Sequence, residues 1–141
     1  MVLECIRPPE WFLGVCCSMF EQDYIMRMIK EMVRALLKLL FDIDTETPSA
    51  ELLEDYDARN RLKVLTDMID DGDINNAENK LYQSLSDNNM LDLKAGILFY
   101  SYLNEKDDEF LQRNHFSRDE VEMGIRTLAS KYDVSDISNL F

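Results

Sequence analysis

The amino-acid sequence predicts a single all-α domain. Proline and glycine are scarce, with 3 and 4 among 141 residues, and no proline follows Pro48. This composition favours helices over a β fold that needs many turns. Apolar residues make up 46% of the chain and recur three and four residues apart in successive segments. We therefore expect about five main helices, arranged as helical hairpins or as a bundle.

Segment 20–41 has the clearest helical pattern. Its apolar residues fill about half of a helical projection, and its basic residues stack at spacings of three and four on the opposite side. Those basic residues are Arg27, Lys30, Arg34 and Lys38. Residues 19–41 also contain four of the eight methionines, whose flexible side chains suit adaptable contact surfaces.

Start and stop signals predict the next two helices. Thr47-Pro48 is interpreted as an N-cap followed by the first helical residue of a helix that runs to about Asp71. Gly72 ends that helix, and Asp73 caps the following one. The helix that starts at Pro48 is expected to have Leu52, Tyr56, Leu62, Leu65 and Ile69 on its inward face. The helix that follows Asp73 is expected to have Ile74, Ala77, Leu81 and Leu85 on its inward face.

Two further helical segments and an apolar tail are expected in the C-terminal half. A fourth helix is expected over about 90–103, and one or two helical turns over 107–115. The tail ends in apolar residues that we expect to dock on the core. These tail residues are Ile137, Leu140 and Phe141.

A capping box marks the start of the last helix. Ser117 and Glu120 have the required spacing, and Phe116 with Val121 forms the matching hydrophobic staple. The helix is expected to continue to about residue 132. Ser117→Ala should therefore cost about 1 kcal/mol, whereas Arg118→Ala should cost almost nothing.

Residues 1–18 are expected to form an atypical leader outside the fold, so that 19–141 is the domain. They share no periodicity with the rest of the chain, and they contain all three cysteines. Because no cysteine follows Cys17, no disulfide framework can stabilise the domain. This distribution favours a reducing, cytoplasmic location.

The stretch 72–81, GDINNAENKL, is similar to the second helix of a tetratricopeptide repeat. A step of one repeat length, about 34 residues, takes Val64 and Met68 to apolar residues, as a second repeat requires. The same step from Gly72 reaches Lys106, where the pattern stops. The sequence therefore predicts one tetratricopeptide-like hairpin and no repeat array.

Three longer segments resemble an uncharacterised family of small, acidic, all-helical bacterial proteins. They are FEQDYIMRMIKEMVRALLKLLF, DDGDINNAENKLY and FLQRNHFSRDEVEMGIRTLASKYD, and the resemblance extends over residues 19–133. It implies an all-helical fold and a domain of unknown function. It implies no activity and no catalytic residue.

A calcium loop is the most specific chemical alternative. The run 67–78 offers Asp67 and Asp71 as ligands and Glu78 as the closing carboxylate. Its third position is Ile69, where an oxygen ligand is needed, and Ile69 also continues the apolar face of the preceding helix. A glycine-ended helix followed by an aspartate-capped helix is therefore the preferred interpretation.

The sequence contains no other constellation that points to chemistry. His115 is the single histidine and has no partner at metal-ligand spacing. The chain has neither a nucleophile motif nor a glycine-rich phosphate loop. We therefore predict no catalytic residue, no cofactor and no metal, although an enzyme without a recognisable motif stays an alternative.

The charge distribution indicates segment 20–41 as the candidate functional surface. The formal charge of −13 disfavours nucleic-acid binding, because it repels phosphates. Residues 19–41 have a slight excess of basic residues, whereas the rest of the chain is strongly acidic. The sequence therefore predicts a non-enzymatic module that binds another protein or a second copy of itself. The candidate surface is Arg27, Met28, Lys30, Met32, Arg34, Leu36 and Lys38.

Two alternatives to this surface remain open. A peripheral membrane protein could lay the basic amphipathic helix among lipid headgroups. A helix that packs its apolar face into the core and leaves only its basic residues in water would have the same pattern. The positions of Met28, Met32 and Leu36 distinguish these cases, since burial of these residues against the other helices would count against both surface roles, protein contact and membrane binding, and exposure would keep both open.

Overall fold

The computed structural model describes residues 18–45, 48–85 and 89–134. Within these ranges the chain forms α-helices and one 3-10 turn, and it contains no strand, which confirms the predicted all-α fold. The elements are α2 (Ser18–Phe41), η3 (Ala50–Leu52), α3 (Tyr56–Asp70), α4 (Ile74–Ser84), α5 (Met90–Asn104), α6 (Asp108–Arg113) and α7 (Arg118–Lys131).

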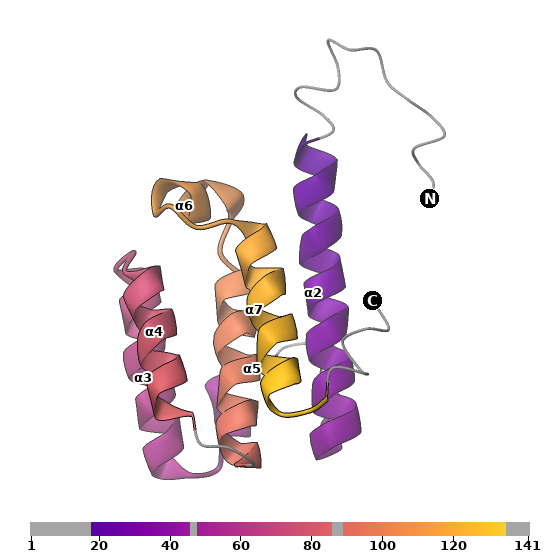
Figure 1. Cartoon of the computed structure of the whole chain (residues 1–141), viewed down its shortest axis with the longest axis vertical. Coiled ribbons are helices and arrows are strands. Elements are labelled where there is room, and N and C mark those ends of the chain that lie inside the picture. The colour runs from indigo at the N-terminus through magenta and orange to yellow at the C-terminus, as the bar shows by residue number, and fades with distance from the viewer. Residues whose placement is uncertain (1–17, 46–47, 86–88, 135–141) are drawn as a thin grey trace.

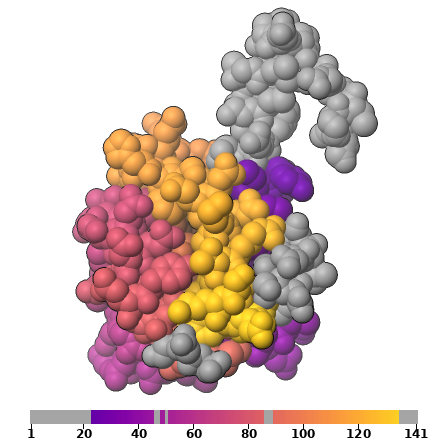
Figure 2. Space-filling view, viewed as in Figure 1, coloured from indigo at the N-terminus to yellow at the C-terminus, as the bar shows by residue number. Residues whose placement is uncertain are grey.

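Helix α5 lies at the centre of the molecule. It packs against α2, α3 and α7, and Figure 1 shows it between the α3–α4 pair and the α7–α2 pair. Ten of its 15 residues are buried, including consecutive residues 96–101. A helix that is apolar on all sides is typical of a core position. In the space-filling view, side chains of α6 and α7 cover much of the face in front of α5 (Figure 2).

Two glycines allow α5 and α7 to approach closely. A Cβ atom at Gly124 of α7 would lie 2.4 Å from Cε1 of Tyr100, and one at Gly96 of α5 would lie 2.7 Å from Cδ2 of Leu128. Both distances are too short for real carbon atoms. The end of Leu128 could shift to admit a side chain at Gly96, whereas the buried ring of Tyr100 leaves no room for one at Gly124. The inward face of α7 is formed by Val121, Ile125 and Leu128, which are fully buried.

Helix α2 packs its broad apolar face against α5 and α7. The buried residues of this face are Ile25, Ile29, Met32, Val33, Leu36 and Leu37. Because its polar side remains in water, α2 is amphipathic in the manner of a core-forming helix. This arrangement matches the alternative in which α2 packs its apolar face into the core and leaves its basic residues in water.

The predicted start of the second helix is wrong. Thr47 lies outside the described residues, and Pro48 precedes the 3-10 turn instead of opening a helix. Helix α3 begins at Tyr56 and is capped by Asp55, whose carboxylate accepts a hydrogen bond from the backbone N–H of Ala58 at 2.9 Å. Tyr56 was expected to face inward but is 72% exposed, because it is the first helical residue.

A buried anchor explains why the chain stays irregular before α3. Leu53 is fully buried in the core between η3 and Asp55. Its carbonyl oxygen accepts hydrogen bonds from Nε and Nη2 of Arg59, at 3.0 and 2.9 Å. These contacts satisfy the backbone where the helix has not yet begun.

The turn between α3 and α4 confirms one half of the preferred interpretation of residues 67–78, the helix that ends at Gly72, but not the aspartate cap of the next helix. Gly72 adopts φ = 88°, and Asp67 and the fully buried Ile69 belong to α3. This stretch is therefore not an open loop of the kind that surrounds calcium. Asp73 does precede α4, but its carboxylate accepts a hydrogen bond from the side chain of Asn76 at 2.8 Å and none from a backbone N–H. Helices α3 and α4 pack together as a hairpin, whose tetratricopeptide-like character stays a prediction.

The capping box at the start of α7 is confirmed. Oγ of Ser117 accepts a hydrogen bond from the N–H of Glu120 at 3.2 Å, and the N–H of Ser117 donates to Oε2 of Glu120 at 2.8 Å. Phe116 and Val121 are buried beside it, as the hydrophobic staple requires. The predicted docking of Ile137, Leu140 and Phe141 lies outside the described residues.

Ser117→Ala should lower the free energy of unfolding by about 1 kcal/mol, because the first turn of α7 loses its N-cap acceptor. Ser130→Ala is the matched control, since Ser130 is exposed in the same helix and alanine suits a helix interior. Chemical denaturation of both variants measures the difference. Equal stability of the two would show that the cap does not hold the start of α7.

Candidate functional site

The seven residues predicted as a contact surface separate into two groups in the structure. Arg27, Lys30, Arg34 and Lys38 are exposed on the polar side of α2. Met32 and Leu36 are only 0% and 1% exposed, and Met28 is half-buried against the core. The apolar part of the predicted surface is therefore corrected: Met32 and Leu36 stabilise the fold and are not available to a partner.

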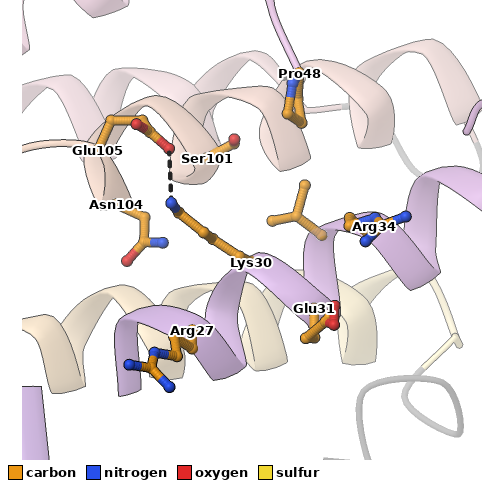
Figure 3. Close-up of a pocket in the computed structure, with 9 residues that line it drawn as sticks. Arg27, Lys30, Glu31, Arg34, Pro48, Ser101, Asn104 and Glu105 are labelled. Atoms are coloured by element: carbon orange, nitrogen blue, oxygen red, sulfur yellow. Dashed lines mark ion pairs between the residues drawn. The ribbon is translucent and has the colours of Figure 1, made fainter. Parts of the chain in front are cut away.

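A groove lies between the polar side of α2 and the C-terminal end of α5. It has a volume of about 570 Å³, within the range of small-molecule sites. Figure 3 shows the side chain of Lys30 extending from α2 toward the end of α5, with Pro48 on the border of the groove. Its lining residues are Arg27, Lys30, Glu31, Val33, Arg34, Pro48, Ser101, Asn104 and Glu105. Three of the four predicted basic residues therefore line one groove.

Each of the four basic residues forms an ion pair within this chain. The side chains are largely exposed, so each pair contributes little to stability and can exchange for another partner. The pairs are Arg27–Asp23 at 2.8 Å, Lys30–Glu105 at 3.9 Å, Arg34–Asp44 at 3.5 Å and Lys38–Asp42 at 3.9 Å.

Of these four, the Lys30–Glu105 pair is the one that crosses the groove from α2 to α5. Figure 3 shows the ammonium of Lys30 pointing toward the carboxylate of Glu105, which directly follows the last residue of α5. Their separation of 3.9 Å is that of an ion pair without a direct hydrogen bond. The two side chains therefore attract each other across the groove without a direct hydrogen bond.

A buried polar network fixes the α5 wall of the groove. Asn104 is only 1% exposed, and its Nδ2 donates a hydrogen bond to the backbone carbonyl of Met26 at 3.1 Å. Nη1 of Arg118 donates to the backbone carbonyl of Asn104 at 2.6 Å and to its Oδ1 at 3.2 Å. Asn104 is thus held by α2 on one side and by α7 on the other.

Arg118→Ala was expected to cost almost nothing, and the burial of Arg118 in the structure contradicts that expectation. Its side chain is 2% exposed. Besides Asn104, its Nη2 donates to the backbone carbonyl of Lys106 at 3.0 Å and to the carboxylate of Asp108. Among the described residues, its Nε is the one buried side-chain nitrogen or oxygen without a hydrogen-bond partner. The guanidinium therefore caps the carbonyls that follow α5, which lack helical donors.

A tyrosine cluster joins α5 to α4 and α7. The hydroxyl of Tyr100 donates a hydrogen bond to Oε2 of Glu78 at 2.6 Å and lies 3.2 Å from the hydroxyl oxygen of Tyr82. The Tyr82 hydroxyl donates to the carbonyl of Gly124 at 3.4 Å. Burial, followed by the hydrogen bond to Glu78, raises the pKa of Tyr100 far above its usual range. Tyr100 therefore remains a neutral donor and braces the helices.

A second cluster joins the end of α3 to α5. Asp70 accepts hydrogen bonds from Nζ of Lys106 at 2.6 Å and from the hydroxyl of Tyr102 at 2.7 Å. The hydrogen bond from Lys106 lowers the pKa of Asp70 below its usual value. Burial and the hydrogen bond to Asp70 raise the pKa of Tyr102. Neither cluster contributes a residue to the groove, so we assign both to the fold.

The remaining candidates from the sequence do not gather into a site. His115 is exposed, with φ = 60°, in the turn between α6 and α7. In the described part of the chain, no three His, Cys, Asp or Glu side chains are grouped so that they could hold a metal ion. Across the same ranges, no helix combines the length and the apolar character needed to cross a bilayer.

The fold and the groove define a small all-helical domain built around one buried helix. The chain belongs to a family that is described as a family of unknown function (DUF6483), whose model matches residues 19–133. This match confirms the resemblance to an uncharacterised all-helical family. Neither the curated proteins nor the solved structures yielded a match to the chain.

Arg118→Ala should lower the free energy of unfolding by about 3 kcal/mol or more, because it leaves the carbonyls of Asn104 and Lys106 and the Asp108 carboxylate without their donor. Arg61→Ala, at an exposed position of α3, should change it by less than about 0.5 kcal/mol. Urea denaturation of the two variants tests this. Similar values for both would mean that Arg118 does not cap α5 in solution.

Proposed function

We propose that this protein is a non-enzymatic binding module that recognises another protein through the groove between α2 and α5. The observation that carries the proposal is the position of Arg27, Lys30 and Arg34 around one groove of a strongly acidic chain. A cytoplasmic location is part of the same proposal, since the domain has no cysteines that would mark an oxidising compartment.

The charge of the lining differs from that of the chain as a whole. The chain carries 28 acidic and 15 basic residues, whereas the described residues that line the groove include three basic side chains and two carboxylates, Glu31 and Glu105. Complementary charge at a contact surface increases the association rate and suppresses wrong partners. The groove is thus suited to a partner segment that the rest of the surface repels.

The shape and composition of the groove support a polypeptide ligand. The basic residues run along α2 from Arg27 to Arg34, a rise of about 10 Å. Val33 and Pro48 add apolar surface, and Ser101 adds a hydroxyl group. Such a mixture of apolar surface with a few oriented polar groups is typical of recognition sites. Polar groups spread over about 10 Å of α2 beside this apolar surface fit a short stretch of chain.

The membrane alternative has weaker support from the same structure. An interfacial helix binds a bilayer by inserting its apolar face below the headgroups. In α2 that face includes Met32 and Leu36, which are packed in the core. Binding through α2 would therefore depend mainly on its four basic residues, because Tyr24 and Leu39 are the large apolar side chains of the described part of this helix that are exposed.

Site-specific cross-linking in cells that produce the protein tests the proposal. Glu31, an exposed residue of the groove, is replaced by a photoactivatable amino acid, and the exposed Lys80 of α4 carries the same group in the control. We expect a covalent adduct with a different polypeptide from position 31 and not from position 80. The masses of the adducts identify the partner class.

Other adducts would contradict the proposal in distinguishable ways. An adduct of twice the chain mass would indicate self-association, and lipid adducts would indicate the membrane alternative. Equal labelling from positions 31 and 80 would show that the groove is no more a contact site than the outer side of α4.

A further inference from the structure

We infer that the groove binds a segment of the partner that carries carboxylate side chains, and that Glu105 competes with this segment for Lys30. The inference rests on the proposed function and adds the chemical class of the ligand and an internal competitor. It starts from an ion pair that spans the groove, between Nζ of Lys30 and Oε2 of Glu105 at 3.9 Å.

The basic side chains of the groove are already in contact with carboxylates. Glu105 meets Lys30 from the α5 wall, and Asp44 meets Arg34 at 3.5 Å from the segment that follows α2. Carboxylates can therefore reach both cations from outside α2. A partner segment that brings its own carboxylates would make the same type of contact.

The Lys30–Glu105 pair is weak enough to be displaced. The two side chains are 51% and 61% exposed, and their separation exceeds the 2.7–2.9 Å that is typical of a charged hydrogen bond, by about 1 Å. A lysine ammonium has three N–H donors, so a ligand carboxylate at hydrogen-bond distance would interact more strongly than Glu105 does. Displacing Glu105 would return its carboxylate to water at little cost, because it is already largely solvated.

The spacing of the cations suggests the spacing of the ligand carboxylates. Lys30 and Arg34 are four residues apart on α2, which corresponds to a rise of about 6 Å. In an extended peptide, side chains on the same side are two residues apart, about 6.6 Å. A segment with acidic residues at alternate positions therefore matches this pair of cations.

The wall that carries Glu105 is held in place by hydrogen bonds. The Glu105 side chain can therefore leave Lys30 without a change in the position of α5. Asn104, the preceding residue, is held by the carbonyl of Met26 and by the guanidinium of Arg118. The backbone at Glu105 therefore need not move when its side chain leaves Lys30. A groove whose walls are already in place avoids part of the entropy cost of binding.

The test uses synthetic peptides as the probe. A peptide with the sequence Glu-Leu-Glu-Leu-Glu is titrated into the full-length, isotope-labelled protein, and amide chemical shifts are followed by NMR. The isosteric Gln-Leu-Gln-Leu-Gln peptide is the control ligand. We expect saturable shifts at Lys30, Arg34 and Glu105 with the acidic peptide and not with the neutral one.

Variants of matched charge separate local competition from general electrostatics. Glu105→Gln and Glu109→Gln each remove one negative charge from an exposed position, but Glu109 lies on α6 outside the groove lining. Glu105→Gln should tighten binding of the acidic peptide by about twofold to fivefold, the range of one exposed ion pair. Glu109→Gln should change the Kd by less than this, and Lys30→Gln should abolish the gain from Glu105→Gln.

Three results would overturn the inference. They are equal Kd values for Glu105→Gln and Glu109→Gln, equal binding of the acidic and neutral peptides, and no saturable shift at the groove. If cross-linking from position 31 still captures a protein, each of these results would reject the acidic ligand, and the proposed protein-binding function would stand. If cross-linking also fails, the proposed function is rejected with it.

Discussion

Helix α5 can be enclosed by its neighbours because α5 and α7 meet at two glycines, one on each helix, where no side chain stands between them. Gly124 faces the ring of Tyr100, and Gly96 faces Leu128, so two glycines remove the atoms that would keep the helices apart. Once α7 lies in this position, α2 can contact both helices with its apolar face. Enclosing an apolar helix removes a large apolar area from water, which is the dominant favourable contribution to folding. The position of α2 therefore depends on this one contact.

The same packing determines which part of α2 can have a function. Its apolar face is used by the core, as the burial of Met32 and Leu36 shows. What remains is a row of basic side chains, three of which line a groove whose other wall is the end of α5. That wall is fixed by Arg118, which reaches from α7 to the carbonyls after α5 and to the side chain of Asn104. The core and the groove thus share residues. A change that weakens the packing of α7 would therefore also disturb the α5 wall of the groove.

Much of this arrangement could be predicted from local sequence signals. The α2 pattern, the turn at Gly72 and the capping box at Ser117 each depend on residues close in sequence, and the structure confirms them. The start of α3 and the burial of Arg118 could not be predicted in this way. Leu53 holds the chain before α3 by inserting into the core, and Arg118 bonds to groups that are brought to it by α5 and α6. The basic residues of the groove were visible in the sequence, whereas Ser101, Asn104 and Glu105 were not, because they join the site only through the α2–α5 contact.

The close contact between α5 and α7 is tested most directly by adding one methyl group at Gly124 in two backgrounds. In the natural chain, Gly124→Ala should lower the free energy of unfolding by about 1 kcal/mol or more, because the new Cβ would collide with the Tyr100 ring. In a Tyr100→Leu background the ring is absent, so the same change should be neutral or should stabilise by up to about 1 kcal/mol through the helix propensity of alanine. Chemical denaturation of the four chains measures this coupling. An equal effect of Gly124→Ala in both backgrounds would contradict the account, because it would mean that α7 does not lie against Tyr100.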